Sequence, residues 1–160
     1  MPGITSISAL ALTTALLAGA VLAQDRIADL RARLAREPSP VSKAKLMPEL
    51  GDAEFAEIDT KVTQGHMPEA IAILRIYRDE VDSCNKGLDA TGVDAEKHPG
   101  GFKQLQISLR ESLRRLDAVI VNMTSDEQAP FLDVRKDLSD VNRRLIQRLF
   151  PHELPAKPEH

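Results

Sequence analysis

Few side chains in this sequence have the type and spacing that catalysis or metal binding requires. The four histidines, His66, His98, His152 and His160, fall in predicted loops or in the C-terminal tail, and no two share a helical face. The Glu-x-x-His, His-Glu-x-x-His and Cys-x-x-Cys-His patterns of di-metal, zinc and haem sites are missing. No serine has an identifiable histidine partner for nucleophilic catalysis. We therefore predict no metal, no other cofactor and no enzymatic activity.

Carboxylates gather at two places along the chain. They are Glu54, Glu57 and Asp59, followed by Asp79, Glu80 and Asp82. Such groups could support general acid–base catalysis or bind a divalent cation, but neither cluster alternates its oxygen ligands as a calcium-binding loop does. We interpret both clusters as solvated faces of helices.

Cys84 is the only cysteine, so the chain cannot form an internal disulfide and its fold must depend on packing. This residue lies between Val81 and Leu88 on an apolar helical stripe, where a buried cysteine acts as a small hydrophobe. We predict a core position for Cys84. An intermolecular disulfide or a reactive thiol is the alternative.

The segment from Phe102 to Phe150 carries the clearest structural signal, two helical patterns joined by a short polar turn. Apolar residues recur in both patterns at steps of three or four. They are Phe102, Leu105, Leu109, Leu113, Leu116, Ile120 and Met123, then Phe131, Val134, Leu138, Val141, Leu145 and Leu149. In the turn, Thr124 and Glu127 have the spacing of a capping box. The pattern predicts an antiparallel helical hairpin.

Three further helices are predicted before the hairpin. The first is a short amphipathic helix from Asp25 to Glu37. The second begins with Ser39 as its N-cap and Pro40 in its first turn, and Pro48 should kink or split it. The third carries an apolar stripe from Ile71 to Leu88. The stretch from residue 85 to residue 101 is predicted as a long glycine-containing loop, which is either functional or mobile.

The first 23 residues contain no charged side chain and end in the small-residue sequence Val21-Leu22-Ala23. This composition is typical of a secretory signal peptide that is cleaved after Ala23. An uncleaved anchor is the alternative, because residues 4–23 could supply the roughly 20 residues that a membrane span requires. We predict an exported protein, periplasmic or secreted, with membrane contact only through an uncleaved signal segment.

Together these elements predict an all-α protein. Four main helices would form an up-and-down antiparallel bundle, with the short N-terminal amphipathic helix packed beside them. We expect residues 1–23 to be the signal peptide, residues 24–150 a single bundle domain, and residues 151–160 a proline-rich disordered tail. The heptad-like spacing of the hairpin would also allow coiled-coil pairing with a second copy of the chain.

Charge is unevenly distributed along the chain, whose formal net charge is −3. Residues 24–100 hold 11 basic and 15 acidic side chains, a net charge of −4, whereas residues 101–150 hold 9 and 7, a net charge of +2. The arginines of the hairpin are therefore a candidate surface for an anionic partner. They are Arg110, Arg114, Arg115, Arg135, Arg143 and Arg144. A mixed, solvated face and docking onto the acidic half of the chain are the alternatives.

The predicted function is an exported, non-enzymatic interaction or scaffold module, whose partner is another protein or a second copy of the chain. Helical grooves recognise such partners through apolar anchors. With one Tyr, four Phe and no Trp, the chain offers little aromatic surface for stacking on bases, so no nucleic-acid partner is predicted. The alternative function is binding of a small ligand or ion in the bundle by the loop from Asn85 to Gly101.

Overall fold

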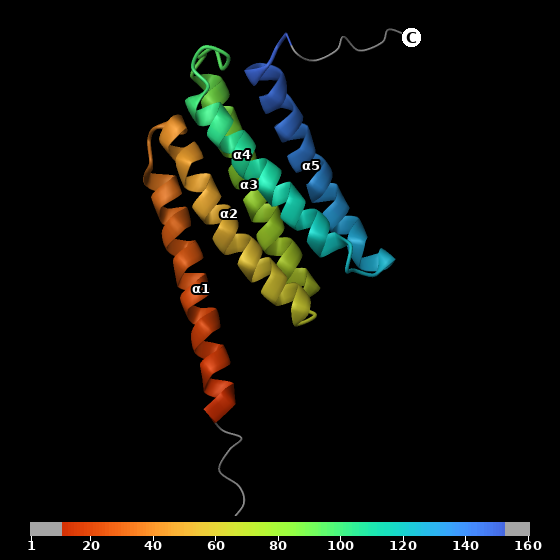
Figure 1. Ribbon diagram of the computed structural model, residues 1–160. Coiled ribbons are helices and arrows are strands. Elements are labelled where there is room, and N and C mark those ends of the chain that lie inside the picture. Colours follow the sequence, from red (N-terminus) through yellow and green to blue (C-terminus); the bar gives the residue numbers. More distant parts are fainter. Residues whose placement is uncertain (1–10, 153–160) are drawn as a thin grey trace, which may run out of the picture.

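The computed structural model describes the backbone of residues 11–152 and the side chains of residues 24–152. Within this range the protein is all-helical, as predicted, and its five helices pack against one another. They are α1 (Ala11–Arg36), α2 (Pro40–Thr63), α3 (Met67–Ala90), α4 (Gly100–Ile120) and α5 (Ser125–Leu149). Consecutive helices run in opposite directions (Figure 1).

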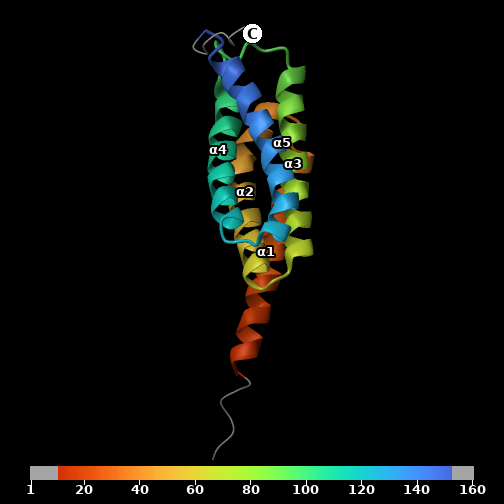
Figure 2. The same ribbon diagram turned by 90° about the vertical axis from the view of Figure 1, so that its right-hand side faces the viewer.

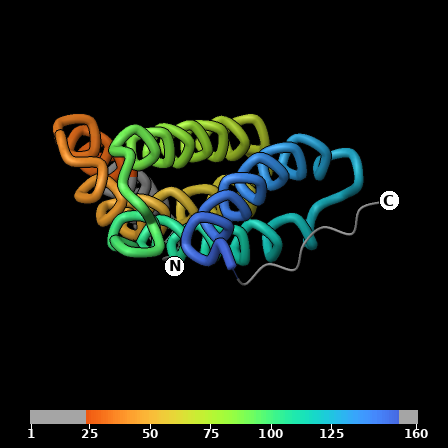
Figure 3. Tube along the Cα trace, turned by 90° about the horizontal axis from the view of Figure 1, so that it is seen from above, coloured from red at the N-terminus to blue at the C-terminus, as the bar shows by residue number. Residues whose placement is uncertain are grey.

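Helices α2, α3, α5 and α4 surround the core in that spatial order, which differs from their order in the chain. Helix α2 lies between α3 and α4, and α5 closes the opposite side by contacting both of them. Figure 3 shows this arrangement from above, with α3 and α4 on opposite sides of α2. Helix α1 stays outside the group of four and packs on α2. Its N-terminal turns extend past the end of the other helices (Figures 1 and 2).

The long connection before the hairpin has a topological explanation. Helix α3 continues to Ala90 and α4 begins at Gly100, so the connecting segment is residues 91–99, shorter than the predicted loop from Asn85 to Gly101. It leads across the end of the bundle, from α3 to a helix on the far side of α2 (Figure 3). A two-residue or three-residue turn joins neighbouring helices and could not make this crossing.

Gly101 permits a close approach of three helices where this connection ends. A Cβ atom placed there would lie 2.6 Å from Cδ2 of Leu88 and 3.1 Å from the backbone Cα of Val41. Because the second distance is to backbone, a side chain at this position would push α4 away from α2. The absence of a side chain at Gly101 thus allows the two parallel helices to pack closely.

Helix α1 is longer than the predicted amphipathic helix from Asp25 to Glu37. It is continuous from Ala11 to Arg36, across the predicted cleavage point after Ala23. Its packing is that expected for an amphipathic helix, because Ile27, Leu30 and Leu34 are buried. The beginning of the predicted signal peptide, residues 1–10, lies outside the described residues. Over the part of the chain that the structure describes, no helix is both long and apolar enough to span a membrane.

The predicted cap of α2 is confirmed, whereas the predicted split is wrong. Ser39 precedes the helix, and its side chain accepts a hydrogen bond from the backbone N–H of Ser42 at 3.3 Å. The helix then runs without interruption through Pro48 to Thr63. Proline removes one backbone donor, but the helix is held by burial of apolar residues on both sides of it, including Met47 and Leu50.

The hairpin is formed by α4 and α5 as predicted, and its turn has the predicted chemistry. The backbone N–H of Thr124 donates to the carboxylate of Glu127 at 3.0 Å, which is the glutamate half of the capping box. Met123 falls in the turn rather than in the first helix. Twelve of the thirteen stripe residues are buried; Leu113 alone is half-buried. All five helices contribute to one hydrophobic cluster.

The predicted tail is described only at its first two residues. Helix α5 ends at Leu149, Phe150 is 46% exposed, and Pro151 and His152 form a turn. Residues 153–160, on which most of that prediction falls, lie outside the described residues.

Candidate functional site

The histidines are dispersed. His66 precedes α3 at one end of the bundle, whereas His98 and His152 lie near the other end, and all three are exposed. His160 is outside the described residues. Among residues with described side chains, no group of three or more histidine, cysteine, aspartate or glutamate residues could hold a metal ion.

Cys84 occupies the predicted core position. Its side chain is buried in α3 within the hydrophobic cluster. Burial raises the pKa of the thiol to about 11, because the thiolate would lose its hydration, and Lys43 offsets this only in part. A thiol of this kind is protonated at neutral pH and is a poor nucleophile.

The two acidic clusters are not simply solvated faces, and that interpretation is wrong for Glu54 and Glu57. Both side chains are buried, Glu54 completely, while Glu80 is half-buried. Asp59 and Asp79 are exposed, as predicted. A signal for Glu54 was present in the sequence, since it lies four residues after Leu50 and four before Ile58, on the same apolar stripe.

Arg31 of α1 joins the two buried or half-buried glutamates. Its Nε donates to Oε1 of Glu54 at 2.9 Å and lies 3.1 Å from Oε1 of Glu80. A second guanidinium nitrogen also donates to Glu54. Because Glu54 belongs to α2 and Glu80 to α3, one side chain ties three helices together. Arg31 was not among the predicted site residues.

Burial dominates the electrostatics of this cluster. Burial, together with the negative charge of Glu80, raises the pKa of Glu54 to about 8 against the opposing effect of Arg31. The pKa of Glu80 is also raised, again mainly by burial and against the effect of Arg31. Perturbed carboxyl groups of this kind are more common at functional sites than on ordinary surfaces, although structural ion pairs produce them too.

A groove of about 340 Å³ lies beside this cluster, between α1 and α3. Its apolar walls are formed by Ile27 and Ala28 of α1 and by Ala72 and Ile73 of α3, and Arg31 is also part of the lining. The groove exists because α1 packs on α2 and not on α3.

Charged residues form one end of the α1–α3 groove. Lys61 of α2 lies 2.6 Å from Glu69 of α3 and 3.7 Å from Glu57 of its own helix. The hydrogen bond from Lys61 lowers the pKa of the exposed Glu69. The groove therefore combines apolar walls with ionised groups at its edge.

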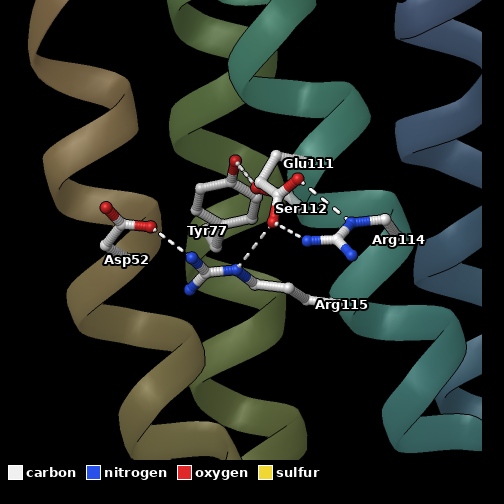
Figure 4. A network of polar contacts seen from close by, with 6 residues as sticks. All are labelled: Asp52, Tyr77, Glu111, Ser112, Arg114 and Arg115. Carbon is white, nitrogen blue, oxygen red and sulfur yellow. Dashed lines mark hydrogen bonds and ion pairs between the residues drawn. The ribbon is translucent and has the colours of Figure 1, made fainter.

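A second, polar cleft of about 330 Å³ lies between α2 and α4 (Figure 4). Ser112 lines this cleft, and its Oγ lies 2.6 Å from the Tyr77 hydroxyl, with which it shares a buried hydrogen bond. Arg115 spans the rim, bonding Asp52 at 2.7 Å and Glu111 at 3.4 Å. Burial raises the pKa of Tyr77 to about 12, so the phenol stays neutral and cannot act as a base.

A third cavity, of about 630 Å³, lies beneath the connection between α3 and α4. Val41, Leu88 and Phe102 provide apolar surface, and Lys97 and His98 of the connection also line it. This is the region in which the sequence predicted a ligand-binding loop.

The six arginines proposed as an anionic-partner surface do not act as six free cations. Four of them pair with carboxylates, either within one helix or across the helix interfaces. The pairs are Arg114 with Glu111, Arg115 with Glu111 and Asp52, Arg135 with Asp117, and Arg143 with Asp140. The hydrogen bond from Lys136 lowers the pKa of Asp140. This pairing reduces the positive potential of the surface. Binding of an anionic partner by these arginines stays a prediction.

No protein-family model, no characterised protein and no solved structure shows a significant match to this chain.

Proposed function

We propose that this protein is an exported helical interaction module that binds one amphipathic helix of a partner protein in the α1–α3 groove. The observation that carries the proposal is the one-sided packing of α1, which leaves Ala28 and Ala72 exposed across the groove from each other. Soluble helices normally bury an apolar face against a neighbour, and a groove between two helices can accept a third through apolar anchors.

The charge of the region around the groove indicates which kind of partner helix it would bind. The groove belongs to residues 24–100, whose net charge is −4. Glu69 at its edge is paired with Lys61, whereas exposed Asp25 and Asp29 lie on α1 close to Ala28 in sequence. A partner helix with basic residues beside its apolar anchors would complement this half of the chain.

Export is compatible with this arrangement. Ile27, Leu30 and Leu34, which are buried side chains of α1, follow Ala23 and would remain in the cleaved chain. Cleavage after Ala23 would therefore keep these three packing residues of α1. Mass spectrometry of the N-terminus of the exported protein tests this part of the proposal, with Gln24 as the expected first residue.

Site-specific crosslinking tests the groove. A photoreactive p-benzoylphenylalanine replaces Ala72 in one version of the full chain and Ala118, an exposed alanine of α4, in the control. We expect the first to crosslink, in its native compartment, to a segment of another protein that has apolar residues at helical spacing and flanking lysines or arginines. Equal crosslinking at both positions, or capture only of a second copy of this chain, would contradict the proposal.

Binding of the identified segment as a synthetic peptide then provides a quantitative measure. Ala72→Arg places bulk in the groove, together with a positive charge that repels the basic partner helix. We expect it to raise the dissociation constant at least about tenfold, which corresponds to about 1.4 kcal/mol. Ala118→Arg is the matched control and should bind as the natural chain does. Circular dichroism of both variants checks that the helices are retained.

Small-ligand binding is the second candidate function, and the cavity beneath residues 91–99 favours it. Its volume of about 630 Å³ is typical of sites for small molecules, and its apolar walls suit an apolar ligand. A thermal-shift screen of fatty acids, lipids and other apolar compounds tests this idea. A true ligand should stabilise the natural chain and Val121→Glu but not Val93→Glu, which places a carboxylate in the cavity lining.

A further inference from the structure

The Arg31–Glu54–Glu80 cluster contains an excess of buried acceptor atoms. Oε1 of each glutamate contacts Arg31, whereas Oε2 of Glu54 and Oε2 of Glu80 are both buried and have no hydrogen-bond donor among the residues that the structure describes. Buried carboxylate oxygens without a donor are energetically costly, so an explanation is needed for both atoms.

The two glutamates supply the explanation themselves, because their carboxyl groups meet at one nitrogen atom: Arg31 Nε lies 2.9 Å from Oε1 of Glu54 and 3.1 Å from Oε1 of Glu80. Two ionised carboxylates have only acceptor atoms and cannot form a hydrogen bond. A single proton makes one of them a donor, from which the other can accept a hydrogen bond. Glu54, which is the more deeply buried, is the better site for this proton because desolvation favours its neutral form.

The charge balance leads to the same result. With both glutamates ionised, Arg31 leaves the cluster with one uncompensated negative charge. With one shared proton, the guanidinium and the remaining carboxylate cancel. A buried group of charges is tolerated when the charges are paired, which is the case only for the protonated cluster.

We propose that Glu54 and Glu80 hold one proton between them and that loss of this proton loosens the junction of α1, α2 and α3. An ionised Glu54 requires water, and α1 is the helix that can admit it at least cost. Arg31 of α1 covers the pair, and α2 is the one helix whose backbone lies close to that of α1 in the described part of the chain.

Few other groups contribute to the electrostatics of the pair. Arg31 on α1 lowers the pKa of both carboxyl groups, and Asp79 on α3 raises that of Glu80. The Tyr77 phenol, also on α3, lies close enough to Glu54 and Glu80 for both to raise the pKa of the phenol. From α4, the phenol is contacted by the neutral hydroxyls of Ser108 and Ser112.

The pH range follows from the direction of the shifts. The pKa of Glu54 is about 8 in the folded protein against an ordinary value of 4.5, so between these values the folded chain holds a proton that the unfolded chain has released. The stabilising contribution of this proton is therefore complete below pH 4.5 and is lost as the pH rises through about 8.

Carboxyl NMR of the ¹³C-glutamate-labelled full chain tests the shared proton. We expect one glutamate resonance to titrate near pH 8 and to be absent in Glu54→Gln, which keeps a neutral donor next to Glu80. Glu49→Gln is the matched control, because Glu49 of α2 pairs with Arg26 and Arg33 of α1 on the exposed surface. If every glutamate titrates near its ordinary value, the proposal is wrong.

Hydrogen exchange tests the loosening. After correction for intrinsic rates, protection of residues 24–36 should fall at least about tenfold between pH 6.5 and pH 9, while residues 131–149 stay protected. In Glu54→Gln the fall should disappear, and in Glu49→Gln it should persist. Unchanged protection of residues 24–36 in the natural chain would overturn the coupling to α1.

Arg31 also lines the α1–α3 groove. Partner binding should therefore share this pH dependence, a consequence that rests on the proposed function. Both tests above use the chain without a partner, so failure of the proton site and failure of the groove are distinguishable.

Discussion

The α4–α5 hairpin and the α1–α2–α3 junction use the same residue types in opposite ways. In the hairpin, apolar stripes fill the interior and ion pairs such as Arg135 with Asp117 lie at the exposed surface. In the junction, Arg31 and Glu54 form a pair in which the glutamate side chain is completely inaccessible to solvent. The hairpin has the arrangement of an ordinary soluble bundle, whereas the junction places a titratable group inside the protein.

The difference shows that burial, more than pairing, decides what an ion pair contributes. Water screens the exposed Arg135–Asp117 pair, and such pairs contribute between 0 and about 1 kcal/mol. In the junction, each charge loses hydration and depends on its partner for compensation. The pKa of Glu54 therefore moves far from its ordinary value. The hairpin carboxylates with shifted pKa values are Glu111, Glu127 and Asp140, and each pKa is lowered by hydrogen-bond partners.

The largest effect is expected from the apolar interior of the hairpin. Leu138 is fully buried in α5, and Leu138→Ala should lower the free energy of unfolding by about 2–5 kcal/mol through lost burial and a residual cavity. Leu132→Ala, on the exposed face of the same helix, should change it by at most about 0.5 kcal/mol. Urea unfolding followed by circular dichroism measures both, and similar losses would contradict the assignment of the two faces.

A smaller, pH-dependent effect is expected in the junction. Arg31→Met removes the cation between Glu54 and Glu80 and should cost about 2 kcal/mol at pH 6, less than a fully buried unpaired charge because the glutamates already share a proton. The cost should grow towards pH 9, where that proton is released. Arg33→Met is the control, since Arg33 forms a 3.7 Å pair with Glu49 at the surface.

Unfolding of Arg31→Met in urea at both pH values provides this measurement. If its cost were the same at pH 6 and pH 9, the junction would behave like the hairpin surface, and the contrast between the two regions would be lost.

The smallest effect is expected from the ion pair between α4 and α5. Arg135→Met should lower the free energy of unfolding by less than about 1 kcal/mol, because the arginine and Asp117 are both about half exposed to solvent. The loss should shrink further in 0.5 M NaCl, where screening weakens surface pairs. If the free energy of unfolding fell by more than about 2 kcal/mol and the loss persisted in salt, this pair would behave like the buried Arg31 cluster.

Local patterns were sufficient to predict most helices and both helix caps. The stripes of the hairpin, the Ser39 cap and the Thr124–Glu127 capping box depend on residues three or four positions apart, so their interactions are visible in the sequence. The predicted split at Pro48 was wrong, because packing on both sides holds the helix together. The predicted loop from Asn85 to Gly101 was too long, because α3 extends to Ala90.

The candidate site depended on contacts between distant segments. Arg31, Glu54 and Glu80 are separated by more than 20 residues from one another, and nothing in their spacing shows that α1 lies across α2 and α3. Glu54 on an apolar stripe was the one local sign of a buried carboxylate. When Arg31 and Glu80 are not known to lie beside it, Glu54 looks like an interruption of the apolar stripe.

The sequence by itself determined the all-helical architecture, the main apolar faces and the position of Cys84 in the core, because periodicity along one chain segment decides which face of a helix avoids water. Only the tertiary structure decided the spatial order of the helices, the groove beside α1 and the burial of Glu54. These features depend on which helices meet, and burial by another helix changes the hydration, and hence the pKa, of a carboxyl group whose local sequence stays the same.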